Sequence, residues 1–164
     1  PGADFSLPGF SGRVLFAEDD PVNQAVLEGL LSAMGLSIDV VSDGRAAYQA
    51  LSRQRYDLVL MDCMMPVTDG FQATAEIRRR EADAPGRRRV PIVAVTASAL
   101  EGDRDRCLAA GMDDYLSKPV RPEALVALLR RWLPLAPASG VAASRVEPRR
   151  VESAVGEPQG GPSA

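Results

Sequence analysis

The sequence predicts an α/β fold in which one parallel sheet of five strands carries helices on both faces. Five short apolar segments alternate with five helix-like segments, and Leu58–Met61 is apolar at every position. A strand of this kind is typical of a parallel sheet that is covered on both sides. Strict alternation implies right-handed crossovers. The 164 residues suffice for one domain with a full core.

The first two strand and helix pairs have clear boundaries. "RVLFA" is the first strand, and the helix after it, at about residues 22–34, ends before a glycine. "SIDVVS" is the second strand, closed by "DG", and its helix covers about residues 45–53. The apolar face of the first helix is predicted from Val22, Val26, Leu30, Leu31 and Met34.

The remaining segments continue the alternation. "DLVLMD" is the third strand and "GFQATAEIRRR" its helix; "VPIVAVTA" is the fourth strand, and the helix after it ends near Ala110, where Gly111 follows. "DYLSKP" is the fifth strand. "RPEALVALLRRWL" is the last helix, with Pro122 in its first turn, where a missing N–H does no harm.

These elements divide the chain into three parts. We expect residues 1–12 to be a linker, residues 13–133 to be the globular domain, and residues 134–164, which are rich in Pro, Gly, Ala and Ser, to be a flexible tail. The N-terminus has no secretory signal pattern and does not begin with Met, so we expect a piece of a longer protein.

Composition excludes several classes of function. The formal net charge of −3 offers no overall footprint for nucleic acid, and no apolar run reaches the length of a membrane span. There is no histidine, which removes histidine-based catalysis and histidine metal sites. Cys63 and Cys107 lack metal-ligand or CxxC spacing, so we expect buried, reduced thiols and a cytoplasmic location. An arginine cluster at residues 78–89 is interpreted as a helix end and a solvated loop.

Charged and polar residues follow the predicted strands at one edge of the sheet. Glu18, Asp19 and Asp20 come after the first strand, and the third, fourth and fifth strands end in Asp62, Thr96 and Lys118. Ligands of open α/β sheets bind beyond the carboxyl ends of the strands. Each residue alone has an ordinary interpretation, such as a helix cap for Asp20. Their joint occurrence at successive strand ends predicts a functional site.

The chemistry of this set indicates phosphoryl transfer. Carboxylates in contact repel each other by up to about 4 kcal/mol per pair at an effective dielectric near 20, so a cation must hold them together. Lys118 supplies one positive charge, and hard oxygen ligands suit Mg²⁺. Asp62 then becomes a candidate nucleophile that forms an aspartyl phosphate, exposed at the mouth of the site, and Thr96 donates its hydroxyl to the phosphoryl oxygens.

"VLFAEDDPVNQAVLEGLLSAMG", "DLVLMDCMMPVTDGFQATAEIR" and "PIVAVTASALEGDRDRCLAAGMDDYLSKPV" together resemble the receiver domain of two-component response regulators, most closely the receivers of hybrid sensor histidine kinases. The resemblance implies a flavodoxin-like (βα)5 fold with strand order 2-1-3-4-5. It also implies that a histidine kinase or a histidine phosphotransfer protein is the partner, with no direct contact to nucleic acid or membrane. Such a domain promotes its own phosphorylation and dephosphorylation, and its parent is expected to be a hybrid kinase.

The resemblance also assigns roles to residues. Asp62 is implied as phosphoacceptor, with Glu18 and Asp19 as the acidic pair for Mg²⁺ and the backbone carbonyl of Met64 as a further ligand. Thr96 and Lys118 are implied as phosphoryl contacts. Thr96 and Tyr115 are the implied switch pair, and the bond between Lys118 and Pro119 is expected to be cis.

This sequence departs from the family pattern at a few positions. Asp20 stands where an Asn is frequent, which adds negative charge near the metal. Thr68 replaces a frequent Met in the "DG" turn, where we expect no effect. Met64 occupies a position that is often polar, so we expect Met64, together with Ser98, to tune the lifetime of the phosphorylated state.

Three other functions are compatible with parts of the pattern. A flavodoxin-like flavin binder shares the fold, but the three acids after the first strand would repel a phosphate. A haloacid dehalogenase-type phosphatase needs an acid two residues after its nucleophile, where Met64 cannot transfer protons. A pseudo-receiver that acts purely as an interaction module is the third alternative, and the complete acid set argues against it.

Overall fold

The computed structural model describes residues 7–84, 86, 88–97 and 101–134, and for Glu101 and Gly102 the backbone alone. Most of the predicted linker and tail therefore lie outside the described residues, as does Ser98. Phe10, which precedes the first strand, is buried in the core, and its amide donates to the carbonyl oxygen of Met34 at 2.8 Å.

The five strands form one parallel sheet in the order β2-β1-β3-β4-β5, which confirms the predicted fold class and topology. The central strand β3 is buried at all five positions, as its continuous apolar run predicts. The strands are β1 (Arg13–Ala17), β2 (Ser37–Val41), β3 (Leu58–Asp62), β4 (Ile92–Thr96) and β5 (Asp114–Ser117).

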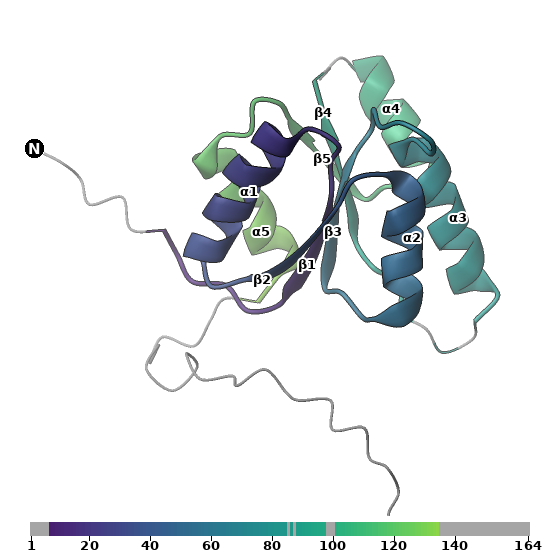
Figure 1. The fold of residues 1–164 in the computed structure, drawn as a ribbon, viewed down its shortest axis with the longest axis horizontal. Coiled ribbons are helices and arrows are strands. Elements are labelled where there is room, and N and C mark those ends of the chain that lie inside the picture. Colours follow the sequence, from purple (N-terminus) through teal and green to yellow (C-terminus); the bar gives the residue numbers. More distant parts are fainter. Residues whose placement is uncertain (1–6, 85, 87, 98–100, 135–164) are drawn as a thin grey trace, which may run out of the picture.

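Helices cover both faces of this sheet (Figure 1). α1 and α5 pack on one face, where their apolar residues join Val14, Phe16 and Leu60 in one core cluster. α2, α3 and α4 lie on the other face over a second cluster that contains Leu15, Val59 and Met61. The helices are α1 (Pro21–Ala33), α2 (Gly44–Arg53), α3 (Gly70–Ala82), α4 (Glu101–Ala109) and α5 (Pro122–Trp132).

The predicted apolar face of α1 is partly wrong. Leu31 and Met34 are buried, together with Leu27, but Val22 and Val26 are 69% and 56% exposed. On a helix with 3.6 residues per turn, Leu27, Leu31 and Met34 cluster within one stripe, whereas Val22 and Val26 fall beyond its edge. The apolar surface of α1 is thus wider than the face that the sheet covers, and part of it faces solvent.

Capping side chains fix where the helices begin. Asp20, Asp43 and Asp69 accept backbone N–H groups at the starts of α1, α2 and α3, and Asp69 forms a reciprocal capping box with Gln72. Asp20 therefore acts as a helix cap.

No helix among the described residues is long and apolar enough to span a membrane.

Candidate functional site at the carboxyl ends of the strands

Three acidic side chains meet where β1 and β3 end. β1 and β3 are hydrogen-bonded neighbours with Ala17 opposite Met61, so the residues that follow arrive at the same edge of the sheet. Carboxylate oxygens of Glu18, Asp19 and Asp62 all lie within 4.8 Å of one another. Glu18 is fully buried and Asp62 is 3% exposed, whereas Asp19 is exposed. The predicted acidic cluster is therefore present in the structure.

Lys118 joins the two buried carboxylates. Its Nζ donates to Oε2 of Glu18 at 3.0 Å and to Oδ2 of Asp62 at 3.1 Å. Burial opposes its charge, but the hydrogen bonds to both acids outweigh burial and raise the pKa of Lys118. Lys118 is also the only lysine among the 19 basic residues of the sequence. A compact ammonium on a flexible stem fits between two carboxylates and another ligand more easily than a planar guanidinium does.

Two amides that the sequence analysis did not single out complete the surroundings of Glu18. Nδ2 of Asn23 donates to Oε1 of Glu18 at 2.7 Å, and Nε2 of Gln24 donates to the Glu18 backbone carbonyl. Both come from the first turn of α1. The available signal was the pair of polar amides in "PVNQ", directly after the acids.

The ionised form of Glu18 is disfavoured in this position. Burial, followed by the hydrogen bond with the Asp62 carboxyl, raises the pKa of Glu18 to about 7, although Asn23 and Lys118 act in the opposite direction. One lysine therefore does not fully compensate two buried carboxylates. A divalent cation next to Glu18 and Asp62 would favour their ionised forms, so the donor set fits Mg²⁺.

The expectation that Asp62 is exposed is wrong. The Asp62 carboxylate is held from two sides, because Oδ2 accepts from Lys118 and Oδ1 accepts from the backbone N–H of Met64 at 3.1 Å. Asp62 is 3% exposed as a whole residue. The exposed members of the site are Asp19 and Met64.

Thr96 lies on β4, which neighbours β3, and Tyr115 lies on β5, the next strand of the sheet. Thr96 ends β4, and its carbonyl oxygen accepts from the backbone N–H of Lys118 at 2.7 Å. Tyr115 is half-buried in β5 and packs against the core on the α4 side, with the guanidinium carbon of Arg104 5.4 Å from its ring centre. The Lys118–Pro119 bond is cis, as expected.

The two cysteines are adjacent and buried. Their sulfur atoms are 4.0 Å apart, between the residue after Asp62 and helix α4. Burial, followed by the neighbouring Cys107, raises the pKa of Cys63 to about 12, and burial also raises the pKa of Cys107. Thiols of this kind are protonated and unreactive at neutral pH.

Gly70 holds α3 against the strand that carries Asp62. A Cβ atom at this position would meet the backbone carbonyl oxygen of Asp62 and would come within 2.9 Å of Cys63 Cα. We expect Gly70→Ala to reduce the free energy of unfolding by about 1–3 kcal/mol, because backbone atoms must move. Urea denaturation measures this change.

The matched control is Gly29→Ala in α1, where an added Cβ meets nothing within 4 Å. Alanine has the higher helix propensity, so this variant should gain about 0.5–1 kcal/mol. Equal stability of Gly70→Ala and the parent would contradict the close approach of α3 to β3.

Residues 14–130 match the model of the response regulator receiver domain, and the chain belongs to that family. The prediction of a receiver most like those of hybrid sensor histidine kinases is confirmed by its relatives. The chain is 42% identical over 124 residues to the sensor protein GacS of Pseudomonas syringae. It is 36% identical over 135 residues to the histidine kinase BarA of Shigella flexneri. These matches cover 76% and 82% of the chain but 14% of each relative.

Solved structures agree with this assignment. The receiver domain of the sensor histidine kinase PA1611 from Pseudomonas aeruginosa, which has a magnesium ion in its active-site cleft, is 49% identical with a TM-score of 0.66; the match covers 76% of this chain and 97% of that one. The receiver of Ssk1 from Saccharomyces cerevisiae, crystallised with the histidine phosphotransfer protein Ypd1, is 32% identical with a TM-score of 0.69, covering 77% and 90%.

Proposed function

We propose that this domain takes a phosphoryl group from a phosphohistidine onto Asp62 in a two-component phosphorelay. The observation that carries the proposal is the contact of Lys118 Nζ with both Glu18 and Asp62, at 3.0 and 3.1 Å, beside the exposed carboxylate of Asp19. A buried acid, a bridging ammonium and an open cluster of oxygen ligands are the parts that an aspartyl phosphate site needs.

The residues that would hold Mg²⁺ are Glu18, Asp19, Asp62 and the backbone carbonyl of Met64. When bound, the ion would offset negative charge on the phosphoryl oxygens. In the transfer, an oxygen of Asp62 attacks phosphorus as the phosphorus–nitrogen bond breaks, and its electron pair stays with the imidazole. Lys118 shifts its hydrogen bonds toward the phosphoryl group, and the Thr96 hydroxyl donates to a phosphoryl oxygen.

The proposed partner is the histidine-bearing helical domain of a kinase or of a phosphotransfer protein, and the proposed location is cytoplasmic. Large apolar side chains surround the site on the outside of the domain: Val22 and Val26 on α1, and Met64 and Val67 after β3, are all exposed. An exposed apolar rim around a buried reactive carboxylate suits docking of a helix that carries the donor histidine. The Ypd1 complex of the Ssk1 receiver supports a partner of this class.

Transfer from a phosphorylated histidine phosphotransfer domain tests the proposal. The receiver is mixed with the radiolabelled donor in Mg²⁺ and, in parallel, in excess chelator. The proposal predicts rapid movement of label to the receiver with Mg²⁺ and little without it. If the label stays on every donor tried and a small-molecule phosphodonor also fails to phosphorylate the receiver, a pseudo-receiver is the better description.

The competing functions differ in what they need from the site. A pseudo-receiver has no use for a buried Glu18 with a raised pKa beside Asp62 and Lys118, so the intact set favours phosphorylation. A flavin binder needs a loop after β1 that accepts phosphate, and here that loop carries Glu18, Asp19 and Asp20. A flavin would also colour the purified protein yellow.

Phosphorylation should be transmitted through Thr96 and Tyr115. The added charge draws the Thr96 hydroxyl toward Asp62, and the half-buried Tyr115 ring moves into the space released. We expect amide chemical shifts, recorded with and without a phosphoryl mimic, to change along residues 96–97 and 103–132 more than along residues 78–84. Changes that stop at Asp62 and Asp19 would contradict this switch.

Met64 is proposed to lengthen the life of the phosphorylated state. Hydrolysis needs a water in line with phosphorus, and a thioether is a weak acceptor that cannot hold this water well. The Met64 side chain is 76% exposed beside the site, so a polar group there would meet solvent directly. We expect Met64→Asn and Met64→Glu to lose phosphate faster than the parent at fixed Mg²⁺.

The decay of the phosphorylated protein is followed by intact mass. Val67→Asn, another exposed apolar residue of the same loop, is the matched control and should leave the rate unchanged. Equal or slower loss in the Met64 variants would show that Met64 is purely a contact residue. The proposed contribution of Ser98 lies outside the described residues and would require the same decay measurement on Ser98→Ala.

A further inference from the structure

A second hollow lies at the opposite end of the sheet from Asp62. It has a volume of about 460 Å³ and is lined by the end of α2, the segment between α2 and β3, one side of α3 and the segment that enters β4. Asp57 and Pro91, directly before β3 and β4, line its floor. Strands β3 and β4 separate it from the acidic site, so the phosphoryl chemistry does not explain it.

Arginine dominates the lining of this hollow, which we call the arginine pocket. Five arginines line it against two acids, Asp57 and Glu81. The two acids already have partners: Glu81 accepts from Arg78 and from the backbone N–H of Val90, and Asp57 accepts from the backbone N–H of Arg13. The arginines of the pocket are Arg53, Arg55, Arg80, Arg88 and Arg89.

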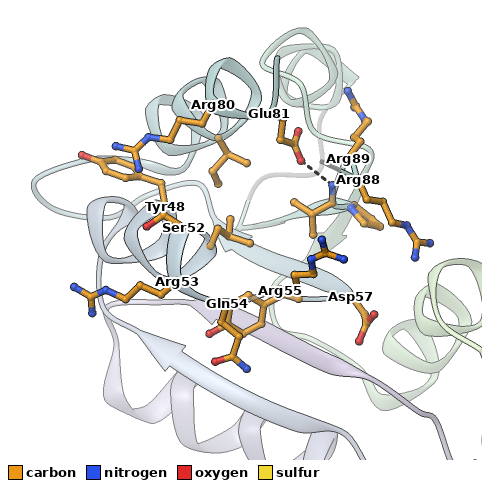
Figure 2. Close-up of a pocket in the computed structure, with 15 residues that line it drawn as sticks. Tyr48, Ser52, Arg53, Gln54, Arg55, Asp57, Arg80, Glu81, Arg88 and Arg89 are labelled. Atoms are coloured by element: carbon orange, nitrogen blue, oxygen red, sulfur yellow. Dashed lines mark hydrogen bonds between the residues drawn. The ribbon is translucent and has the colours of Figure 1, made fainter. Parts of the chain in front are cut away.

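Three of the five arginines have no side-chain partner among the described residues. Arg80 pairs with Glu76, and Arg89 pairs with Asp113. In the part of the chain that the structure describes, the side chains of Arg53, Arg55 and Arg88 form no hydrogen bond or ion pair. Figure 2 shows the Arg55 side chain near the open middle of the pocket, whereas Arg53 points away from it and the guanidinium group of Arg88 points outward from the rim. An unpaired guanidinium group at an opening favours an anion, and its forked geometry matches phosphate.

The rest of the pocket is apolar and aromatic. Leu51, Ile77 and Val90 contribute its apolar wall, and the rings of Tyr48 and Tyr56 line it from α2 and from the segment after α2. A volume of about 460 Å³ is within the range of small-molecule sites and exceeds what a lone phosphate fills. An occupant that fills the pocket would bring a ring or other apolar body together with its negative charge.

We propose that the arginine pocket binds a small phosphate ester with a planar ring, the chemical class of a nucleotide. Its phosphate pairs with Arg55 and with the exposed Arg88, whose side chain turns in from the rim, and its ring lies on the apolar wall near Tyr56. The Tyr56 side chain is fixed for this role, because its hydroxyl donates to Asp39 at 2.6 Å. Binding here is independent of phosphorylation at Asp62 and would give the domain a second input.

Titration of the full chain, isotope-labelled, in Mg²⁺-free buffer tests the proposal by chemical shift. The probes are adenosine and guanosine 5′-monophosphate, the two nucleosides, ribose 5-phosphate and inorganic phosphate. We expect saturable shifts at Arg55, Tyr56, Glu81 and Val90 with at least one nucleotide, and binding weaker by roughly tenfold or more when the ring or the phosphate is absent.

Variants locate the site. Arg55→Ala and Arg88→Ala should each weaken nucleotide binding by roughly tenfold or more. Arg45→Ala, an exposed arginine at the other end of α2, should change it less than about twofold. Absence of saturable nucleotide binding would overturn the proposal, as would shifts centred on Asp19 and Asp62. Saturation of the pocket by a polyglutamate peptide without any nucleotide binding would instead identify a contact for an acidic protein, and would also overturn it.

Discussion

Asp62→Asn should abolish phosphorylation, with incorporation from a small-molecule phosphodonor falling at least about a hundredfold. The amide has the shape of the carboxylate but is a far weaker nucleophile, so it cannot form the acyl phosphate. Loss of one charge also weakens the metal cluster of Glu18, Asp19 and Asp62. Intact mass after incubation with the phosphodonor and Mg²⁺ measures the effect.

Loss of folding would not explain this result. Asp62 is a buried carboxylate beside Glu18, and it is one cause of the raised pKa of Glu18. Removing its charge relieves that repulsion, so the metal-free variant should melt no lower than the parent. Asp105→Asn, at an exposed acid of α4, is the matched control and should be phosphorylated normally. Normal incorporation in Asp62→Asn would mean that another residue is the acceptor.

Lys118→Ala should produce the largest loss of stability among the site variants. Its Nζ is the cation shared by Glu18 and Asp62, which are 0% and 3% exposed. Breaking a buried ion pair from one side typically costs 3–5 kcal/mol, and we expect about 2–3 kcal/mol because 22% of the Lys118 side chain is in contact with solvent. Urea denaturation in Mg²⁺-free buffer measures the difference.

The conservative variant separates charge from shape. Lys118→Arg keeps a positive charge near both carboxylates and should retain more stability than Lys118→Ala. Added Mg²⁺ should stabilise Lys118→Ala more than the parent, because the ion then meets carboxylates that have lost their ammonium. If Lys118→Ala is as stable as the parent and Mg²⁺ stabilises it no more strongly, Lys118 is not the cation that holds Glu18 and Asp62 together.

The pH dependence of the metal-free protein follows from Glu18. Its pKa is raised from 4.5 to about 7 in the folded state, so the folded protein binds more protons than the unfolded chain between these values. This contribution to stability is complete below pH 4.5 and is lost as pH rises through 7. Because Lys118 lowers the pKa of Glu18, the loss in Lys118→Ala should extend to higher pH.

Most of the fold followed from the sequence because its signals are local and repeated. The fully apolar run at Leu58–Met61 predicted the central strand, and the glycines at positions 35 and 111 predicted the ends of α1 and α4 within a few residues. The face of α1 was less predictable, since apolar periodicity does not distinguish a covered stripe from an adjacent exposed one. Val22 and Val26 continue the pattern of the helix, yet they face solvent.

The sequence predicted which residues meet at the site but not how deeply they are buried or which groups they contact. Strand ends in a parallel sheet meet at one edge, so the order of Glu18, Asp62 and Lys118 along the chain was enough to bring them together. The burial of Asp62 depends on where the Lys118 ammonium and the Met64 N–H are placed, which spacing alone does not determine. The arginine pocket is likewise assembled from side chains on separate elements, and the sequence showed it simply as basic residues near a helix end.

The most direct test of the central claim is to locate the phosphoryl group itself. The chain is incubated with a phosphorylated histidine phosphotransfer domain, in Mg²⁺ or in excess chelator, and its peptides are analysed by tandem mass spectrometry after trapping of the acyl phosphate. We expect one phosphoryl group per chain, on the peptide that contains Asp62, in the Mg²⁺ sample alone. A phosphoryl group on any other residue, or on Asp62 to the same extent without metal, would contradict it.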